Sequence, residues 1–178
     1  MLTPLKTRKP GDIQWFSLLT QGAWVGEDEA MDETMPDLLT DDRMSAHLGI
    51  QVKHREPGHA VVTMTVTSGM ANGHGITHGG AVFALADTAF ALACNRSAGV
   101  MGVTVSATID FIAASGVGDV LVARACERVE RGRSGLYDVT VYRGDEVIAE
   151  FRARSRTVAA PSSRVTAVGH RESSSRQS

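Results

Sequence analysis

Residues 79–93 read GGAVFALADTAFALA. This stretch consists almost entirely of Ala, Leu, Val and Phe, with small residues on several faces, and this composition favours a helix that is packed on most of its sides. Asp87 is the only ionisable residue in the segment. The segment therefore predicts a core helix that carries a single carboxyl group.

Strand patterns flank this helix on both sides. The strands are expected at residues 50–55, 60–67, 100–112, 120–130, 136–143 and 146–157. A short helix is expected over Asp37–Leu48, with Gly49 ending it. The whole pattern predicts an α+β fold in which an antiparallel β-sheet wraps around one long central helix.

Composition divides the chain into three parts. With 178 residues, of which 43% are hydrophobic, it is long enough for one core, so a single domain is expected, at residues 37–158. Residues 1–36 are expected to be an accessory acidic extension, because eight of the 20 Asp and Glu residues lie within residues 27–42. The Ser- and Arg-rich tail, residues 159–178, has too little apolar surface to offset the entropy of ordering and is expected to be disordered.

The charge balance and the cysteines disfavour several classes of protein. Lys and Arg total 18 against 20 Asp and Glu, so no cationic field exists over the whole chain to bind nucleic acid or a membrane surface. The longest mainly apolar run, residues 81–94, is too short to span a bilayer, and no secretory segment is recognisable. The two cysteines lack a CxxC spacing and fit a reducing compartment, so we expect a cytoplasmic protein.

A metal site is also disfavoured, although His74 and His78 have the spacing of metal ligands on a helix. Gly75 and Thr77 lie between them, and the glutamate of an HExxH motif is absent. The same loop lacks the last glycine of a GxGxxG motif, so it does not predict a dinucleotide site.

The chemistry is expected at Asp87 and in the loop before its helix, residues 72–80, NGHGITHGG. A carboxyl group among apolar neighbours is either hydrogen-bonded for structure or is a catalytic base or nucleophile with a raised pKa. The loop supplies an amide at Asn72, an imidazole at His78 and, at Gly79, a backbone N–H that could stabilise an oxyanion. Asp87 and Gly79 are about 12 Å apart along the helix axis, so a substrate would have to reach both across a fold or subunit boundary.

Two segments resemble a known family. Residues 72–80 and the sequence LADTAFA at residues 85–91 resemble the hotdog-fold acyl-CoA thioesterases, specifically the phenylacetate-degradation (PaaI-like) branch. Shorter matches are TIDF at 108–111, GD at 118–119, GLYD at 135–138 and FR at 151–152. The similarity covers residues 38–158 and implies the hotdog fold.

The resemblance implies acyl-CoA hydrolysis and a role for each site residue. Asp87 would activate the hydrolytic water or attack the thioester itself, and the Gly79 N–H would bind the thioester oxygen. His78 would shape the turn, Asn72 would position the water or the carbonyl group, and Thr104 would assist from the following strand. In this family the sites lie between subunits, which implies a homodimer or a dimer of dimers in which Asp87 of one chain meets Asn72 and Gly79 of its neighbour.

The turn Arg131-Gly132-Arg133-Ser134-Gly135 resembles the loop that contacts the phosphates of CoA in this family, where two guanidinium groups would bind the anionic groups. CoA is then part of the substrate, and no separate cofactor is implied.

The resemblance also implies an aromatic acyl group, of phenylacetyl or hydroxyphenylacetyl type. Phe83, Phe90 and Phe111 could line its pocket, and each is equally a core residue by type. Two alternatives stay open. One is a hotdog hydratase or dehydratase, although those proteins place their His in a Pro-rich loop and this loop has no Pro. The other is a non-catalytic acyl-CoA-binding protein.

Overall fold

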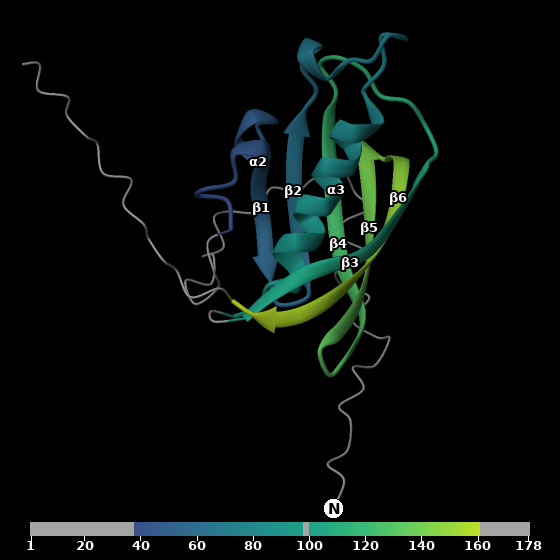
Figure 1. Cartoon of the computed structure of the whole chain (residues 1–178). Helices are drawn as coiled ribbons and strands as arrows, with labels where there is room; N and C mark the ends of the chain where they lie inside the picture. Colours follow the sequence, from purple (N-terminus) through teal and green to yellow (C-terminus); the bar gives the residue numbers. More distant parts are fainter. Residues whose placement is uncertain (1–37, 98–99, 161–178) are drawn as a thin grey trace, which may run out of the picture.

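The computed structural model describes residues 38–97 and 100–160, which form a sheet around a long helix (Figure 1). In chain order the elements are α2 (Arg43–His47), β1 (Gln51–Glu56), β2 (His59–Thr65), the 3-10 helix η1 (Ser68–Met70), α3 (Gly79–Cys94), β3 (Val100–Phe111), β4 (Val120–Arg131), β5 (Ser134–Arg143) and β6 (Glu146–Ala159). The predicted extension at residues 1–36 and residues 161–178 of the predicted tail lie outside the described residues.

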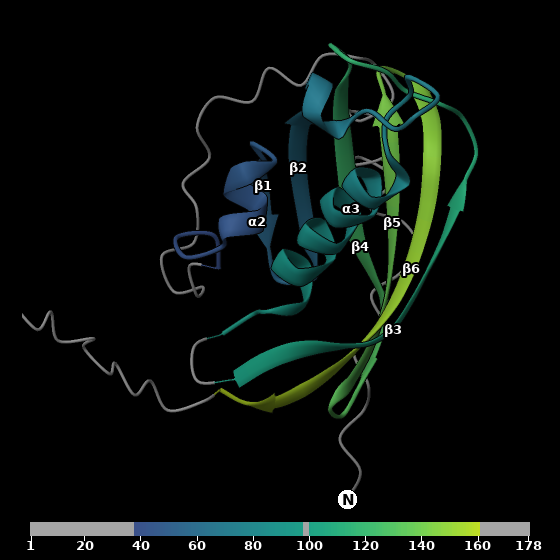
Figure 2. The same cartoon turned by 45° about the horizontal axis from the view of Figure 1, so that its top comes forward.

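The six strands form one antiparallel sheet in the order β1-β2-β4-β5-β6-β3. Figure 2 shows this sheet curving around α3, which contacts β2, β4 and β5. The arrangement confirms the predicted α+β fold with one central helix. Each predicted strand agrees with an observed one to within two residues at either end.

The core lies between α3 and the concave face of the sheet. Leu85, Ala86 and Ala89 of α3 are fully buried, and alternate residues of β4 and β5 point into the same interior. Phe90 is 1% exposed and packs edge-to-face on Tyr137, with ring centroids 5.3 Å apart. Phe90 is therefore a core residue and not a pocket residue, because its ring has almost no accessible surface for a ligand.

The first helix is shorter than predicted. The pattern suggests residues 37–48, whereas α2 spans Arg43–His47. Asp42 is the reason, because it is the N-cap, and its carboxylate accepts a hydrogen bond from the Ser45 backbone N–H at 3.0 Å. Gly49, with a φ of 64°, follows the end of the helix as predicted.

The β4–β5 hairpin is tighter than predicted. Arg131 pairs with Ser134, which leaves Gly132 and Arg133 as a two-residue turn, and Gly132 has a φ of 61°. Ser134 and Gly135 are therefore the first residues of β5, so the turn is shorter than the predicted five residues.

None of the helices within the described ranges combines the length and the apolar character needed to cross a membrane. The same ranges hold no cluster of three or more His, Cys, Asp or Glu side chains that could bind a metal ion.

Candidate active site

The N-terminus of α3 presents a free backbone N–H. His78 is the N-cap, and its Nδ1 accepts a hydrogen bond from Gly80 N at 2.9 Å. Gly79, the first helical residue, donates no hydrogen bond to any other described residue. An N–H at this position carries the positive end of the helix dipole, so Gly79 can bind a negatively charged oxygen. His78 thus shapes the turn that presents this N–H.

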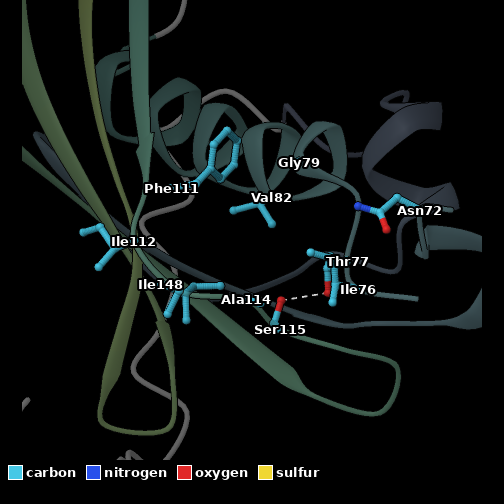
Figure 3. A pocket seen from close by; sticks show the side chains of 11 residues that line it. Asn72, Ile76, Thr77, Gly79, Val82, Phe111, Ile112, Ala114, Ser115 and Ile148 are labelled. Atoms are coloured by element: carbon cyan, nitrogen blue, oxygen red, sulfur yellow. Dashed lines mark hydrogen bonds between the residues drawn. The ribbon is translucent and has the colours of Figure 1, made fainter. Parts of the chain in front are cut away.

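Asn72 is held beside this N-terminus by the loop. Its Oδ1 accepts a hydrogen bond from His74 N at 2.8 Å, and its backbone N–H donates to Ile76 O at 2.8 Å. Asn72 and Gly79 line a common cavity of about 330 Å³. Figure 3 shows the amide nitrogen of Asn72 on the side of this cavity. The Oδ1 atom is engaged in the loop, and the Nδ2 group can donate a hydrogen bond to a bound molecule.

The rest of this first cavity is largely apolar, with Val82, Phe111, Ile112 and Ile148 in its wall (Figure 3). Phe111 is 56% exposed. A Cβ on Gly79 would lie 3.0 Å from the Phe111 Cζ, so glycine keeps the approach to the N–H open. Phe111 is therefore accessible enough to contact a bound molecule, whereas Phe90 is not.

Asp87 lies on the same helix in a different cavity, of about 250 Å³, which Leu38, Leu39, Thr88 and Met101 also line. Burial raises the pKa of the Asp87 carboxyl above its ordinary value. Within the described part of the chain, its carboxylate takes part in no hydrogen bond or ion pair. A purely structural role for Asp87 would require a hydrogen-bond partner for its carboxylate, and residues 38–97 and 100–160 offer none.

The two cavities have no lining residue in common. One holds Asn72 and Gly79 and the other holds Asp87, two helical turns further along α3. A single chain thus leaves the two halves of the predicted site apart, as the spacing along the helix suggests.

The remaining predicted residues lie elsewhere. Thr104 is exposed on β3, opposite Ser155 and next to a bulge in the strand, and it lines neither cavity. Arg131 and Arg133 are exposed at the β4–β5 hairpin. Phe83 is at the surface, packs edge-to-face on Phe151, and also lines neither cavity.

Gly135 has a structural reason to be glycine. A Cβ there would lie 2.6 Å from the Tyr137 ring and 2.8 Å from the Ser155 Oγ, and both side chains are buried. The close packing of these two side chains therefore favours glycine at this position.

Sequence reasoning missed a hydrogen-bonded row beside Asp87. The Ser45 Oγ donates to the Asp42 Oδ2 at 2.6 Å and lies 3.1 Å from the Thr88 Oγ1. The spacing of Asp42 and Ser45 is an N-cap signal that the sequence carries. The contact to Thr88 joins residues 43 positions apart, and no local signal predicts it.

Comparisons with known proteins point to one family. Residues 74–150 match the family model described as "Thioesterase superfamily". The chain is 43% identical over 122 residues to the "Acyl-coenzyme A thioesterase PaaI" of Escherichia coli K12, and the match covers 68% of this chain and 86% of that protein.

Comparison with solved structures also finds PaaI proteins. The E. coli PaaI structure, from the phenylacetic acid degradation operon, superposes with a TM-score of 0.64 and 42% identity, over 67% of this chain and 86% of that one. A mutant of the phenylacetic acid degradation protein PaaI from Thermus thermophilus has a TM-score of 0.62 and 36% identity, over 65% and 98%. The Streptococcus mutans protein smu.793, bound to acetyl CoA, has a TM-score of 0.58 and 25% identity, over 62% and 89%.

Proposed function

The chain belongs to the thioesterase superfamily, with the hotdog fold of the PaaI-like acyl-CoA thioesterases, and we propose on this premise that it hydrolyses the CoA thioester of an aromatic acid. One observation carries the proposal. Asp87 is a partly buried carboxyl with a raised pKa, without a partner among the described residues, on the helix whose first N–H is free. The family makes the protein a thioester hydrolase; the aromatic acyl group and the residue roles are the proposed part.

The proposed reaction uses Asp87 in one of two ways. As a general base it takes a proton from water, whose oxygen bonds to the thioester carbonyl carbon. As a nucleophile its oxygen bonds to that carbon and forms an anhydride, which water then cleaves. In both, the Gly79 N–H and the Asn72 amide stabilise the carbonyl oxygen as it becomes negative, the C–S bond breaks, and the thiolate is protonated to free CoA.

We place the complete site between two copies of the chain. Asp87 of one subunit would meet Asn72 and Gly79 of the other, which is supported by their location in separate cavities. The edge strand β3 supports a second copy as well, because β6 is its only partner among the described strands and its residues Val105 and Phe111 are 55% and 56% exposed. A dimer, or a dimer of dimers, is therefore the proposed assembly.

Mixed oligomers test this shared site. Two inactive chains, Asp87→Asn and Gly79→Pro, are co-expressed in equal amounts. Half of the dimers are then mixed, and one of the two sites in each mixed dimer is intact, so about a quarter of the wild-type activity returns. Co-expression of two differently tagged Asp87→Asn chains is the matched control and stays inactive. If the mixture is as inactive as the control, each site is built from one chain.

The acyl group is proposed to be aromatic, of phenylacetyl or hydroxyphenylacetyl type. The cavity with Asp87 has apolar walls at Leu38, Leu39, Leu92 and Met101, and the E. coli relative belongs to a phenylacetic acid degradation operon. We expect kcat/KM for phenylacetyl-CoA and hydroxyphenylacetyl-CoA to exceed that for straight-chain acyl-CoA by at least about tenfold, measured as thiol release. A preference for straight chains overturns the aromatic assignment. Tight binding without thiol release favours the non-catalytic alternative.

CoA is proposed to bind as part of the substrate, with Arg131 and Arg133 on its phosphates and Gly132 allowing the tight turn between them. Both arginines are exposed, and only Gly132 lies between them in the hairpin. Ser134 and Gly135, which follow the turn at the start of β5, complete the proposed CoA site.

A further inference from the structure

A row of three hydrogen-bonded side chains ends beside Asp87. It begins at Asp42 before α2, continues through Ser45, which is 3% exposed, and ends at Thr88 on α3. Thr88 and Asp87 line the same cavity. The row thus connects the cap of one helix to the cavity that holds the candidate catalytic carboxyl.

Asp42, the first residue of this row, determines which hydroxyl group donates each hydrogen bond. Hydrogen bonds from the Ser45 hydroxyl and the Ser45 backbone N–H lower the pKa of Asp42, so its carboxylate is ionised and only accepts. The one hydroxyl hydrogen of Ser45 is therefore used on Asp42. The contact of 3.1 Å between Ser45 and Thr88 then requires the Thr88 hydroxyl to donate. Thr88 is left with only lone pairs to offer the cavity.

Two further polar side chains line this cavity, Asp42 and Asn95, and both are already engaged. Each carboxylate oxygen of Asp42 accepts a hydrogen bond from Ser45. The Asn95 Oδ1 accepts from Gly102 N at 2.8 Å, and its Nδ2 donates to Ala91 O at 2.9 Å. Beside Asp87, Thr88 is thus the hydroxyl of this cavity whose acceptor capacity is unused by the residues described.

We propose that the Thr88 Oγ1 orients the water that hydrolyses the acyl group, as the acceptor of one water hydrogen while the Asp87 carboxylate accepts the other. The inference rests on the proposed function. With both hydrogens held, a lone pair of the water oxygen points to the carbonyl carbon; the oxygen bonds to that carbon and one proton passes to Asp87. Ser45 and Asp42 are positioning residues, because they act only by fixing the direction of the Thr88 hydrogen.

The first test compares Thr88→Val with Thr88→Ser. Val keeps the shape of Thr but removes the acceptor, so kcat falls about tenfold while KM stays within a factor of about two, which corresponds to one lost hydrogen bond. Ser restores the oxygen and keeps kcat within about threefold of wild type. A role of Thr88 in packing alone would give the opposite order, because Ser removes the methyl group and Val keeps it.

The second test reverses the row without changing its shape. In Asp42→Asn the amide still caps α2, because Asn is an equally good N-cap, and its NH₂ group can donate to the Ser45 oxygen. Ser45 then donates to Thr88, and the Thr88 hydrogen points into the cavity where an acceptor is needed. We expect kcat to fall about as far as in Thr88→Val, with an unchanged KM. Asp41→Asn, which neutralises the neighbouring exposed acid, is the matched control and keeps wild-type kcat.

The outcomes separate this inference from the proposed function. A wild-type protein that releases no CoA from any thioester overturns both. Normal wild-type turnover with an unchanged kcat in Thr88→Val overturns the water-orienting role and leaves the thioesterase proposal standing. A raised KM with a constant kcat in Thr88→Val also overturns it, because the hydroxyl would then bind the substrate itself.

Discussion

Replacing Asp87 with Asn is expected to lower kcat for acyl-CoA hydrolysis by about a thousandfold, measured as thiol release with the preferred thioester. The amide has nearly the shape of the carboxyl group but can neither take a proton from water nor attack the carbonyl carbon. The loss is therefore expected whether Asp87 is the base or the nucleophile. Retention of more than about a tenth of the wild-type kcat would show that the hydrolytic group lies elsewhere.

The same variant is expected to be at least as stable as the wild type. Burial raises the pKa of Asp87 in the folded state above its unfolded value, so the stability that this group contributes is greatest at low pH and is lost as pH rises through the folded pKa. At neutral pH the ionised carboxyl destabilises the fold, and a neutral amide removes that cost. A melting temperature equal to or above that of the wild type, together with lost turnover, separates chemistry from unfolding.

The raised pKa also predicts the pH dependence of the wild-type reaction. Only the ionised carboxylate can accept a proton or attack, so kcat/KM is expected to fall as pH is lowered through a value above the ordinary Asp pKa of 3.8. The midpoint of this fall on the acid side of the pH profile gives the pKa of Asp87. A profile that is flat down to the ordinary Asp range would exclude Asp87 as the titrating group.

Replacing Gly79 with Pro is expected to lower kcat by about a hundredfold to a thousandfold, because it deletes the N–H that stabilises the oxyanion. Proline fits this position for two structural reasons. Gly79 is the first residue of α3, where proline is favoured, and His78 before it has φ and ψ of −63° and 131°, in the extended region that a residue before proline adopts. The helix is thus retained while one donor is lost, and circular dichroism checks the fold.

Gly79→Ala is the matched control for this variant. It adds the same Cβ, 3.0 Å from the Phe111 Cζ, but keeps the N–H. The Phe111 ring is the far end of an exposed side chain and can shift, so we expect the loss in kcat to stay below about tenfold. If alanine is as damaging as proline, the added carbon and not the missing N–H is responsible, and the oxyanion role of Gly79 is wrong.

Local patterns predicted the elements of the fold well. The Ala-rich segment that becomes α3 and the alternating segments that become β4 and β5 have periodicities set by neighbouring residues, so they can be read without the tertiary structure. The same holds for the start of α3, where His78 and Gly79 are adjacent in the chain. The predicted length of α2 was wrong, because the Asp42 cap overrides the apolar pattern before it.

The candidate site could be predicted only in part. The raised pKa of Asp87 follows from its apolar neighbours in the sequence, and burial in the structure is its cause. The separate roles of Phe90 and Phe111 could not be predicted, because both are aromatic residues in apolar segments. One faces the closed interior under the sheet and the other the open wall beside Gly79.

Local sequence patterns are therefore enough to predict a helix with one carboxyl group, a free N–H at the start of that helix, and an antiparallel sheet that covers it. Which side chains share a cavity follows from the tertiary structure. It brings Ser45 to Thr88 and places Phe111 of β3 beside Gly79. The physical reason is that backbone preferences act over a few residues, whereas these contacts arise where the curved sheet and α2 pack against α3, between segments that are distant in the chain.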